Sequence, residues 1–309
     1  MNAPTITIGT RGSALALYQA GATEDALRAA HPGIELVREV IKTTGDRRTD
    51  VALSQVAKVE GVLDKGVFTK ELETALSDGV IDIAVHSLKD VPTVLAPEFE
   101  IAGTLERAPV RDVLITRAEG GLDSLPEGAT VGTSSVRRAK QLQWLRPDLK
   151  VVDIRGNVPT RLKKVAQGEC DAIMLAEAGL VRLGYCMDEH AEVEGEKVHF
   201  SPLEVTEFLP AAGQGAIGFE IRKGDDQARA MVESILHAET FLQARAEREF
   251  LRLLDGGCHT PVGVFSLLDG DLLTMEARVF PDEGGEPRTA KAEGGEPLEV
   301  ARNLFESLV

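Results

Sequence analysis

The sequence Ile-Gly-Thr-Arg-Gly-Ser at residues 8–13 decides how the first half of this chain folds. It follows the alternating run Thr5–Ile8, which predicts a strand, and Ser13 is a typical N-cap for a helix over residues 14–30. Val-Gly-Thr-Ser-Ser at residues 131–135 repeats the pattern before a second helix. Two such repeats predict two similarly built α/β halves with a ligand cleft between them. A chance likeness is the alternative, because strand, glycine, serine and helix often follow one another.

A second pair of stretches supports two similar halves. Gly79–Val85 and Gly168–Met174 both read as a turn followed by a short, buried type of strand. The tail alternates in two runs from Val262 and ends in a helix, which predicts a smaller α+β domain. The acidic segment Asp188–Lys197 is expected to be a surface excursion, and residues 43–66 are expected to form a long loop.

Composition limits the classes of function. The chain has 34 Lys and Arg against 50 Asp and Glu, a net charge of −16, and 4% aromatic residues. Such a chain repels nucleic acid and anionic membranes and offers few platforms for stacking bases. Three widely spaced cysteines argue against a zinc site and for a reducing compartment. With no signal peptide and no apolar run of about 18 residues, we expect a cytoplasmic protein without a metal.

A basic cluster spans Val131–Arg161 inside this acidic chain. It holds seven basic and two acidic residues, a local charge of +5. The ordinary interpretation is a solvated helix face. The arginines stand at helix starts and strand ends, however, where backbone N–H groups and guanidinium groups bind carboxylates or phosphates. We therefore favour an anion cleft with Arg137, Arg138 and Arg155, and with Arg11 at the matching place in the first half.

The stretch His86–Pro92 places a base, a hydroxyl, a cation and a carboxylate at the exit of a predicted strand. Asp90 precedes Val91 and Pro92, so one interpretation is a turn-forming residue. The functional interpretation is an ionised carboxylate beside Lys89 that stabilises a cation or moves a proton. His86 is expected to be a packed strand-end residue, because no metal-ligand partner stands at short spacing.

Cys258 stands in a turn with two glycines before it and Pro261 after it. A free cysteine is usually a small, buried apolar residue. The glycines also allow a ligand or another backbone to approach the sulfur closely. From these residues alone, both interpretations stay open.

Seven motifs stand in one order across the chain: Gly9–Ser13, Lys70–Glu73, His86–Pro92, Val131–Arg138, Arg155–Arg161, Leu209–Ala216 and Gly256–Gly263. Together they resemble the hydroxymethylbilane synthase (porphobilinogen deaminase) family. The resemblance implies an α/β fold with two similar periplasmic-binding-protein-like α/β domains around a cleft and a smaller C-terminal α+β domain. It implies a first domain of residues 1–105 with 214–235, a second of residues 106–213 and a third of residues 236–309.

The resemblance also implies a transferase that joins four porphobilinogen molecules, with loss of ammonia, into the linear tetrapyrrole hydroxymethylbilane. Cys258 would carry a dipyrromethane cofactor through a thioether, and Asp90 would be the catalytic carboxylate. A thiolate suits that attachment, because it attacks the cationic azafulvene left by the loss of ammonia. Further cofactor-binding residues would be Ser87, Lys89, Thr133, Ser134, Ser135, Arg137, Arg138, Arg155, Gly156 and Gln214. Substrate-binding residues would be Arg11, Ser13, Arg155, Arg161, Arg182 and Arg248.

Two other functions compete with this one. A non-catalytic two-lobed anion-binding module explains the two halves, but it needs neither a cysteine in a glycine turn nor a third domain. A cysteine hydrolase needs a histidine beside the thiol, and His259 is expected to point away because it is adjacent in sequence. The family resemblance implies a monomer whose partner is the small molecule porphobilinogen, with no nucleic acid and no membrane.

Overall fold

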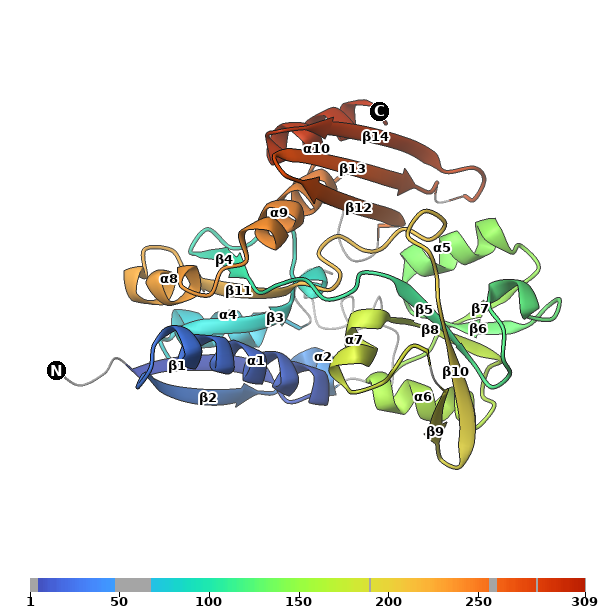
Figure 1. The fold of residues 1–309 in the computed structure, drawn as a ribbon, viewed down its shortest axis with the longest axis horizontal. Coiled ribbons are helices and arrows are strands. Elements are labelled where there is room, and N and C mark those ends of the chain that lie inside the picture. The colour runs from blue at the N-terminus through green and yellow to red at the C-terminus, as the bar shows by residue number, and fades with distance from the viewer. Residues whose placement is uncertain (1–4, 48–67, 189, 256–259, 282, 309) are drawn as a thin grey trace.

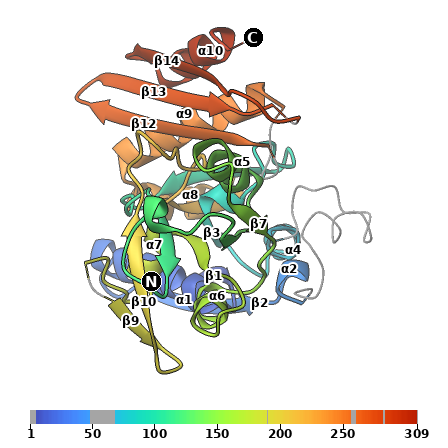
Figure 2. The ribbon, with the colours of Figure 1, turned by 90° about the vertical axis from the view of Figure 1, so that its right-hand side faces the viewer.

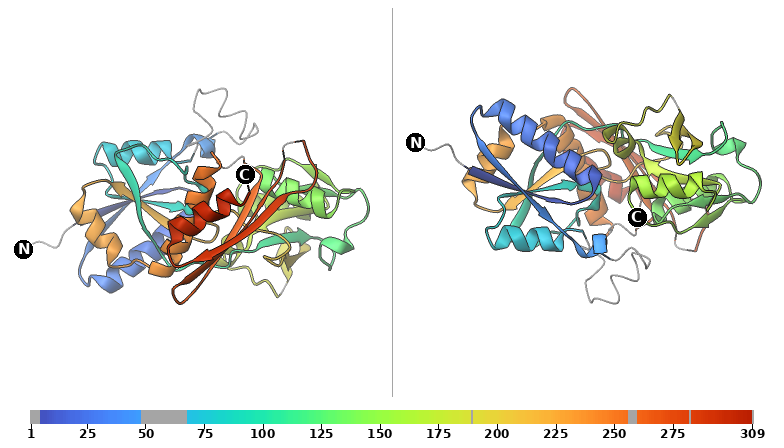
Figure 3. Two further views of the ribbon diagram at one scale, coloured as in Figure 1. Left: turned by 90° about the horizontal axis from the view of Figure 1, so that it is seen from above. Right: turned by 90° about the horizontal axis from the view of Figure 1, so that it is seen from below.

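The computed structural model describes the chain apart from residues 1–4, 48–67, 189, 256–259, 282 and 309. The described residues form two α/β units side by side and a smaller unit that lies across both (Figures 1 and 3). Each unit is built on one sheet. The predicted architecture of two similar α/β domains and a smaller α+β domain is therefore confirmed. In the described part of the chain, none of the helices combines the length and the hydropathy that a membrane span requires.

The first sheet has five described strands. Across the sheet they are β2 (Glu35–Ile41), β1 (Thr5–Arg11), β3 (Ile83–Ser87), β11 (Ile217–Arg222) and β4 (Phe99–Thr104). β1 is parallel to β2 and β3, whereas β11 is antiparallel to β3 and β4. Because β11 follows the whole second unit in sequence, two crossing segments join the units.

The second sheet repeats this order and adds one strand at its edge. Across the sheet its described strands are β7 (Lys150–Val152), β6 (Thr130–Gly132), β8 (Ala172–Ala176), β5 (Asp112–Thr116), β10 (Glu196–Pro202) and β9 (His190–Val193). β6 is parallel to β7 and β8, and β5 is antiparallel to β8. Gly9 pairs with Ala84 in the first sheet, and Gly132 pairs with Ile173 in the second. The sequence echo therefore reflects a structural repeat.

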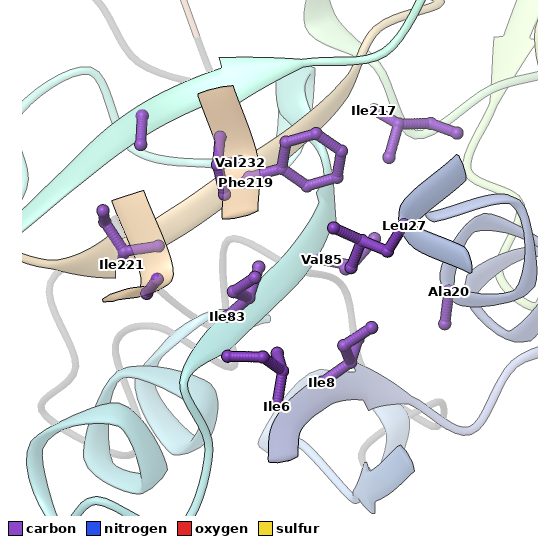
Figure 4. Packing of buried hydrophobic residues seen from close by; sticks show 12 residues of the cluster. Ile6, Ile8, Ala20, Leu27, Ile83, Val85, Ile217, Phe219, Ile221 and Val232 are labelled. Carbon is purple, nitrogen blue, oxygen red and sulfur yellow. The ribbon is translucent and has the colours of Figure 1, made fainter. Parts of the chain in front are cut away.

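Helices cover both faces of the first sheet. α1 (Ala14–Ala30) and α8 (Asp226–Glu233) bury Leu27 and Val232 in one cluster with Phe219 of β11 (Figure 4). α4 (Lys70–Ser77) packs its two buried leucines on the opposite face. Burial of a side chain of this size contributes about 1.5–3 kcal/mol. The alternating apolar residues of β1 and β3 pack under these helices and fix the position of each strand. The side chains at the strand ends are thereby held in place as well.

The second unit has the corresponding helices after its parallel strands. They are α5 (Val136–Leu145), α6 (Val158–Ala166) and α7 (Glu177–Arg182). Leu142 of α5 packs against Val131, and Leu162 of α6 packs against Ile173. The short helix α2 (Thr44–Arg47) belongs to the first unit.

The third unit stands above the other two (Figure 2). Its sheet orders β12 (Val262–Asp269), β13 (Leu272–Val279) and β14 (Arg288–Gly294), all antiparallel, against α9 (Ala238–Leu253) and α10 (Pro297–Glu306). Phe250 of α9 and Leu304 of α10 are buried with Val264 and Met275. This core attaches α9 firmly to the sheet, and α9 then reaches down to the cavity described below.

The local structure differs from the prediction in several places. The described residues of Asp188–Lys197 lie at the surface, as expected, but they also form most of the hairpin β9–β10, because Val198 and Phe200 are buried and hold β10 against β5. β4 and β14 were not predicted, since β4 lies between prolines and β14 exposes charged side chains at a sheet edge. Residues 44–47 of the expected long loop are helical, and residues 48–67 lie outside the described residues.

The two crossing segments run side by side between the α/β units (Figure 1). Residues 105–111 lead from β4 to β5, and residues 203–216 lead from β10 to β11. The amide of Leu105 donates to the carbonyl of Ile217 at 3.2 Å, and that of Ala108 donates to the carbonyl of Gly215 at 3.1 Å. These bonds place the second crossing segment against the first, next to the strand ends of both units.

Candidate active site

A cavity of about 860 Å³ lies where the three units meet. The first and second units contribute strand ends and helix starts, and the third contributes Leu251, Val262 and Val264. Of the predicted site residues that the structure describes, all line this cavity except Thr133. Residues far apart in sequence therefore come together as the motif order implied.

The cavity wall is strongly basic. Among the described lining residues, Asp90 is the one acidic side chain. Nine basic side chains share the wall with it: Arg11, Lys42, Lys89, Arg137, Arg138, Arg155, Arg161, Arg182 and Arg248. The net charge of the chain is −16, so this cavity is a local positive region in an acidic protein. A ligand with several carboxylates matches such a wall.

Asp90 stands in a tight turn directly after β3. The strand ends at Ser87, and residues 88–90 form a 3₁₀ turn with Leu88 buried beneath it. The Lys89 ammonium donates to the Gln214 side-chain oxygen at 3.2 Å. Burial, with the charge of Arg138 nearby, lowers the pKa of Lys89 to about 8. The turn therefore presents a cation and a carboxylate to the same cavity.

The helix start at residues 133–135 satisfies its own hydroxyl groups. Ser135 is the N-cap of α5 and accepts from the amide of Arg138 at 3.4 Å. Ser134 donates to the carbonyl of Ile154 at 2.5 Å. Thr133 is buried and accepts from the amide of Ser135 at 3.2 Å. Thr133 thus fixes the shape of this turn from behind, and we correct its expected place in the cavity wall.

Arg137 and Arg138 line the cavity and also have a partner within the protein. Both side chains are buried, and both are held by Asp112 at the start of β5. Arg137 Nη1 donates to Asp112 at 2.6 Å, and Arg138 donates to it through Nε at 2.9 Å and Nη2 at 2.6 Å. The two guanidinium groups outweigh the effect of burial and hold the pKa of Asp112 well below its usual range. Sequence reasoning missed this carboxylate, because it lies outside the basic cluster.

A second helix start in the same unit positions two more arginines. Asn157 caps α6 by accepting from the amide of Thr160 at 3.0 Å, with Pro159 in the first turn. Gly156 has a φ of +117°, and a side chain there would lie 2.7 Å from Thr160. Arg161 Nε donates to the carbonyl of Gly156 at 2.8 Å. Burial, with Arg138 and Arg155 nearby, lowers the pKa of Arg161 to about 10, so it stays charged at neutral pH.

Three further arginines reach the wall from separate elements. Arg11 ends β1 and lies over the Phe68 ring, 4.1 Å from its centroid, while Ser13 caps α1. Arg182 of α7 donates to the carbonyl of Gly215 at 2.7 Å, and burial lowers its pKa to about 10. Arg248 of α9 donates to the carbonyls of residues 91 and 92. The last two arginines therefore also tie the cavity wall together.

Lys42 and Phe68 are among the lining residues that were not predicted from sequence. Phe68 packs on Gly45, where an added side chain would lie 2.1 Å from the ring. Lys42 and Gly45 follow β2 closely in sequence, but a lysine and a glycine in a polar stretch are too common to be a specific signal. His86, in contrast, is buried against Glu220 at 2.8 Å, which confirms its prediction as a packed residue.

The predicted anchor Cys258 lies outside the described residues, together with Gly256, Gly257 and His259. Thr260 and Val262, which follow it in sequence, line the cavity. Among the described residues, no group of three or more His, Cys, Asp and Glu side chains is arranged to hold a metal ion.

Comparison with protein families decides the classification. Residues 6–230 match the family described as porphobilinogen deaminase, dipyromethane cofactor binding domain. Residues 241–309 match the porphobilinogen deaminase C-terminal domain. The chain belongs to the porphobilinogen deaminase family. The family resemblance that the ordered motifs indicated is thereby confirmed.

Individual members of the porphobilinogen deaminase family are similar over most of their length. The protein of this name from Syntrophobacter fumaroxidans is 44% identical, over 91% of this chain and 86% of its own. That of Roseiflexus castenholzii is 42% identical, over 99% and 96%, and that of Nitrobacter winogradskyi is 46% identical, over 93% and 87%.

Solved structures with a similar arrangement are more distant. The periplasmic VFT2 domain of Bordetella pertussis BvgS covers 79% of this chain and 92% of its own, at 16% identity and a TM-score of 0.45. A putative LysR family regulator from Pseudomonas aeruginosa covers 76% and 74%, at 15% identity and a TM-score of 0.46. No functional conclusion rests on these two likenesses.

Proposed function

We propose that this chain polymerises four porphobilinogen units head to tail, with loss of ammonia, into the linear tetrapyrrole hydroxymethylbilane. Its family membership supports this transferase reaction. The observation that carries the proposal is the cavity wall, where the described lining residues include nine basic side chains and one carboxylate. Each pyrrole brings two carboxylates, so a growing chain requires many cations. A reaction that passes through a cationic pyrrole requires one anion at the reacting centre.

The residues of the cavity fit a dipyrromethane cofactor. Such a group has four carboxylates, and the wall offers ammonium and guanidinium donors in excess of its single carboxylate. Cys258 would hold the group covalently, and Lys89, Arg155 and the Gln214 side chain would bind its polar groups. When bound, the group supplies a nucleophilic pyrrole carbon for the first condensation.

Asp90 is the residue that we assign to the chemical step. When ammonia leaves porphobilinogen, the remaining pyrrole is cationic, and a fixed carboxylate at that point lowers the energy of the charge as it develops. The 3₁₀ turn holds Asp90 in place before the substrate arrives. Asp90 would also accept a hydrogen bond from the pyrrole N–H, which orients the ring.

The basic residues hold the substrate without taking part in bond changes. Arg11, Ser13, Arg161, Arg182 and Arg248 would bind the acetate and propionate groups. Arg161 and Arg182 come from the second unit and Arg11 from the first, so a bound chain would be held from both sides. Bidentate guanidinium contacts fix orientation as well as position.

A non-catalytic anion-binding module fits the cavity less well. Such a module needs the cations, but a carboxylate in the wall would weaken binding of a polyanion by like-charge repulsion. Asp90 is placed on the wall by its own turn, which favours the enzyme.

The remaining parts of the proposal concern organisation and setting. We propose three domains, with residues 1–105 and 214–235 in the first, 106–213 in the second and 236–309 in the third. The pairing of β11 with β3 and β4 supports a discontinuous first domain. We further propose a cytoplasmic monomer that acts on porphobilinogen alone, and the charge of −16 disfavours a nucleic-acid partner.

The proposal is tested by incubating the purified full-length chain with porphobilinogen and measuring ammonia and products. The expected result is four ammonia molecules for each linear tetrapyrrole, identified by mass spectrometry. Boiled protein is the control, because porphobilinogen condenses slowly by itself. Tight binding of porphobilinogen without ammonia release would contradict the enzyme and support the anion-binding module.

A further inference from the structure

We propose that Arg107 and Glu247 are positioning residues, which hold the turn at residues 213–215 so that the Gln214 side-chain oxygen accepts a hydrogen bond from Lys89. Neither residue lines the cavity. Their action would link the third unit, through a crossing segment, to the cation next to Asp90. This inference rests on the proposed function only in giving Lys89 a place in the active site.

The turn that carries Gln214 is unusual in its backbone. Gly213 and Gly215 have φ angles of +69° and +84°, which side-chain-bearing residues rarely adopt. A side chain at Gly215 would lie 2.4 Å from the carbonyl oxygen of Ala108 on the first crossing segment. The two glycines that flank Gln214 have little intrinsic preference for one backbone conformation. Contacts from outside the turn must therefore fix the position of Gln214.

Glu247 and Arg107 supply those contacts from two sides. The Glu247 carboxylate accepts from the amide of Gly213 at 2.8 Å, and Arg107 Nε donates to the carbonyl of Gln214 at 2.8 Å. The two side chains are joined by a bidentate pair with distances of 2.9 and 2.8 Å. Ser266 of β12 donates to the same carboxylate at 2.6 Å. Glu247 is fully buried, so this pair is strongly constrained.

The side-chain amide of Gln214 has one orientation that fits its surroundings. Its nitrogen faces three acceptors, the carbonyls of Val110 and Arg111 at 2.7 and 3.4 Å and the Asp112 carboxylate at 3.1 Å. The side-chain oxygen must then point the other way, towards the Lys89 ammonium at 3.2 Å. A shift of the turn would withdraw this acceptor from a buried cation and favour the neutral amine.

The test measures the charge of Lys89 directly. The full-length chain, purified from cells that make no porphobilinogen, is labelled with acetic anhydride at a series of pH values. Mass spectrometry of the peptide containing Lys89 gives the pH at which the amine becomes reactive, near 8 in the unchanged chain. The double variant Arg107→Gln/Glu247→Gln keeps the net charge and is expected to lower this midpoint by about 1 pH unit.

Three further variants make the result decisive. Gln214→Met is expected to lower the midpoint, because it removes the side-chain oxygen that accepts from the Lys89 ammonium. Glu177→Gln breaks the comparable bidentate pair with Arg111, which does not hold the turn, and should leave the midpoint unchanged. If the double variant does not fold, Ser266→Ala should still lower the midpoint by a smaller amount.

If the double variant folds, an unchanged midpoint in it would overturn the inference. If it does not fold, an unchanged midpoint in Ser266→Ala would do so. In either case the pair of Arg107 and Glu247 would have a purely structural role. An unchanged midpoint in Gln214→Met would overturn it as well, since the charge of Lys89 would then not depend on the Gln214 side-chain oxygen. Substrate is absent from this labelling experiment. Its failure is therefore distinguishable from a failure to release ammonia from porphobilinogen.

Discussion

The two α/β units share a strand order but present different chemistry to the cavity. Ala84 and Ile173 occupy the same place in the two sheets, so Asp90 of the first unit corresponds to Gly179 of the second. After β3 the chain forms the 3₁₀ turn with Lys89 and Asp90, whereas after β8 it enters α7. The same scaffold thus carries a carboxylate on one side and no side chain on the other.

Carboxylates in the second unit have a different task. Glu177, at the start of α7, pairs with Arg111 at 2.7 and 2.9 Å and does not line the cavity. Asp112 is buried beneath Arg137 and Arg138. The comparison teaches that the second unit uses its acidic residues to hold basic ones in place. Among the described residues that line the cavity, the acidic side chain comes from the first unit.

The largest expected effect comes from removing the buried carboxylate. Asp112→Asn leaves two buried guanidinium groups without their anion, which costs about 3–5 kcal/mol of the free energy of unfolding. Asp148→Asn is the matched control, since Asp148 pairs with Arg146 near the surface, where solvent screens the pair and its loss should change the free energy of unfolding little. Urea denaturation measures both. Equal effects of the two substitutions would contradict the role of Asp112 as the buried anion that holds two arginines in the second unit.

Replacing the aspartate of the first unit by asparagine should lower the turnover rate and leave stability almost unchanged. Asp90→Asn is expected to lower kcat by about 10²–10³-fold, because the developing cation loses its fixed counter-charge. Stability should change by about 0.5 kcal/mol or less, since Asp90 is partly exposed in a turn. Ammonia release and urea denaturation are measured on the same samples. Near-normal ammonia release would remove Asp90 from the chemical step.

The pH dependence of the free energy of unfolding tests whether Asp112 is ionised in the folded chain. The pKa of Asp112 is depressed in the folded chain, so the stability it contributes is present above its unfolded pKa of about 3.9. That contribution, about 2 kcal/mol, is lost as the pH falls towards the folded pKa. The gap in unfolding free energy between the unchanged chain and Asp112→Asn should therefore narrow below about pH 4. A gap that stays constant down to pH 2 would contradict the ionised pair.

A carboxylate placed in the second unit tests the asymmetry itself. Gly179→Ala should be tolerated, because a side chain there would lie 3.6 Å from Leu15 and 3.7 Å from Val158, in ordinary contact. Gly179→Asp should lower kcat/KM about tenfold, since the added charge repels the substrate carboxylates. It should not restore activity to Asp90→Asn. Restored activity in that double variant would show that either side of the cavity can supply the anion.

The smallest effect concerns what the two units share. Ser13 and Ser135 each cap the helix after a first strand, accepting from the amides of Ala16 at 3.2 Å and Arg138 at 3.4 Å. Ser13→Ala and Ser135→Ala should each lower the free energy of unfolding by about 1 kcal/mol. Denaturation curves that differ strongly between the two would indicate that the repeat is not equivalent at its helix starts.

Sequence patterns predicted the repeated scaffold because its signals are local. Ser13 and Asn157 cap helices as expected, and the alternating runs after Val262 form a hairpin. The strand β4 was not predicted because it lies between prolines. β14 was not predicted because the residues that alternate with its exposed charged side chains are small alanines rather than large apolar residues. Their positions in the sheets depend on pairing with β11 and β13. Such pairing between distant segments cannot be predicted from one sequence.

The site was predictable in its members but less so in their partners. Motif order brought Arg11, Asp90 and Arg161 to one cavity, as expected. Asp112 binds Arg137 and Arg138 through contacts between elements that are separated in sequence. No spacing pattern in the sequence predicts these contacts. Basic residues at a helix start look alike in sequence whether they bind a ligand or a buried carboxylate.

The central claim is that a chain of pyrroles grows in this cavity from Cys258 under the action of Asp90. Denaturing mass spectrometry of the full-length chain, with limiting porphobilinogen, tests it most directly. The account predicts a covalent adduct of two pyrrole units before substrate is added and a ladder of further units afterwards. Asp90→Asn should keep the adduct without forming the ladder, and Cys258→Ser should show neither. An unmodified mass throughout, in protein from cells that make porphobilinogen, would contradict the account.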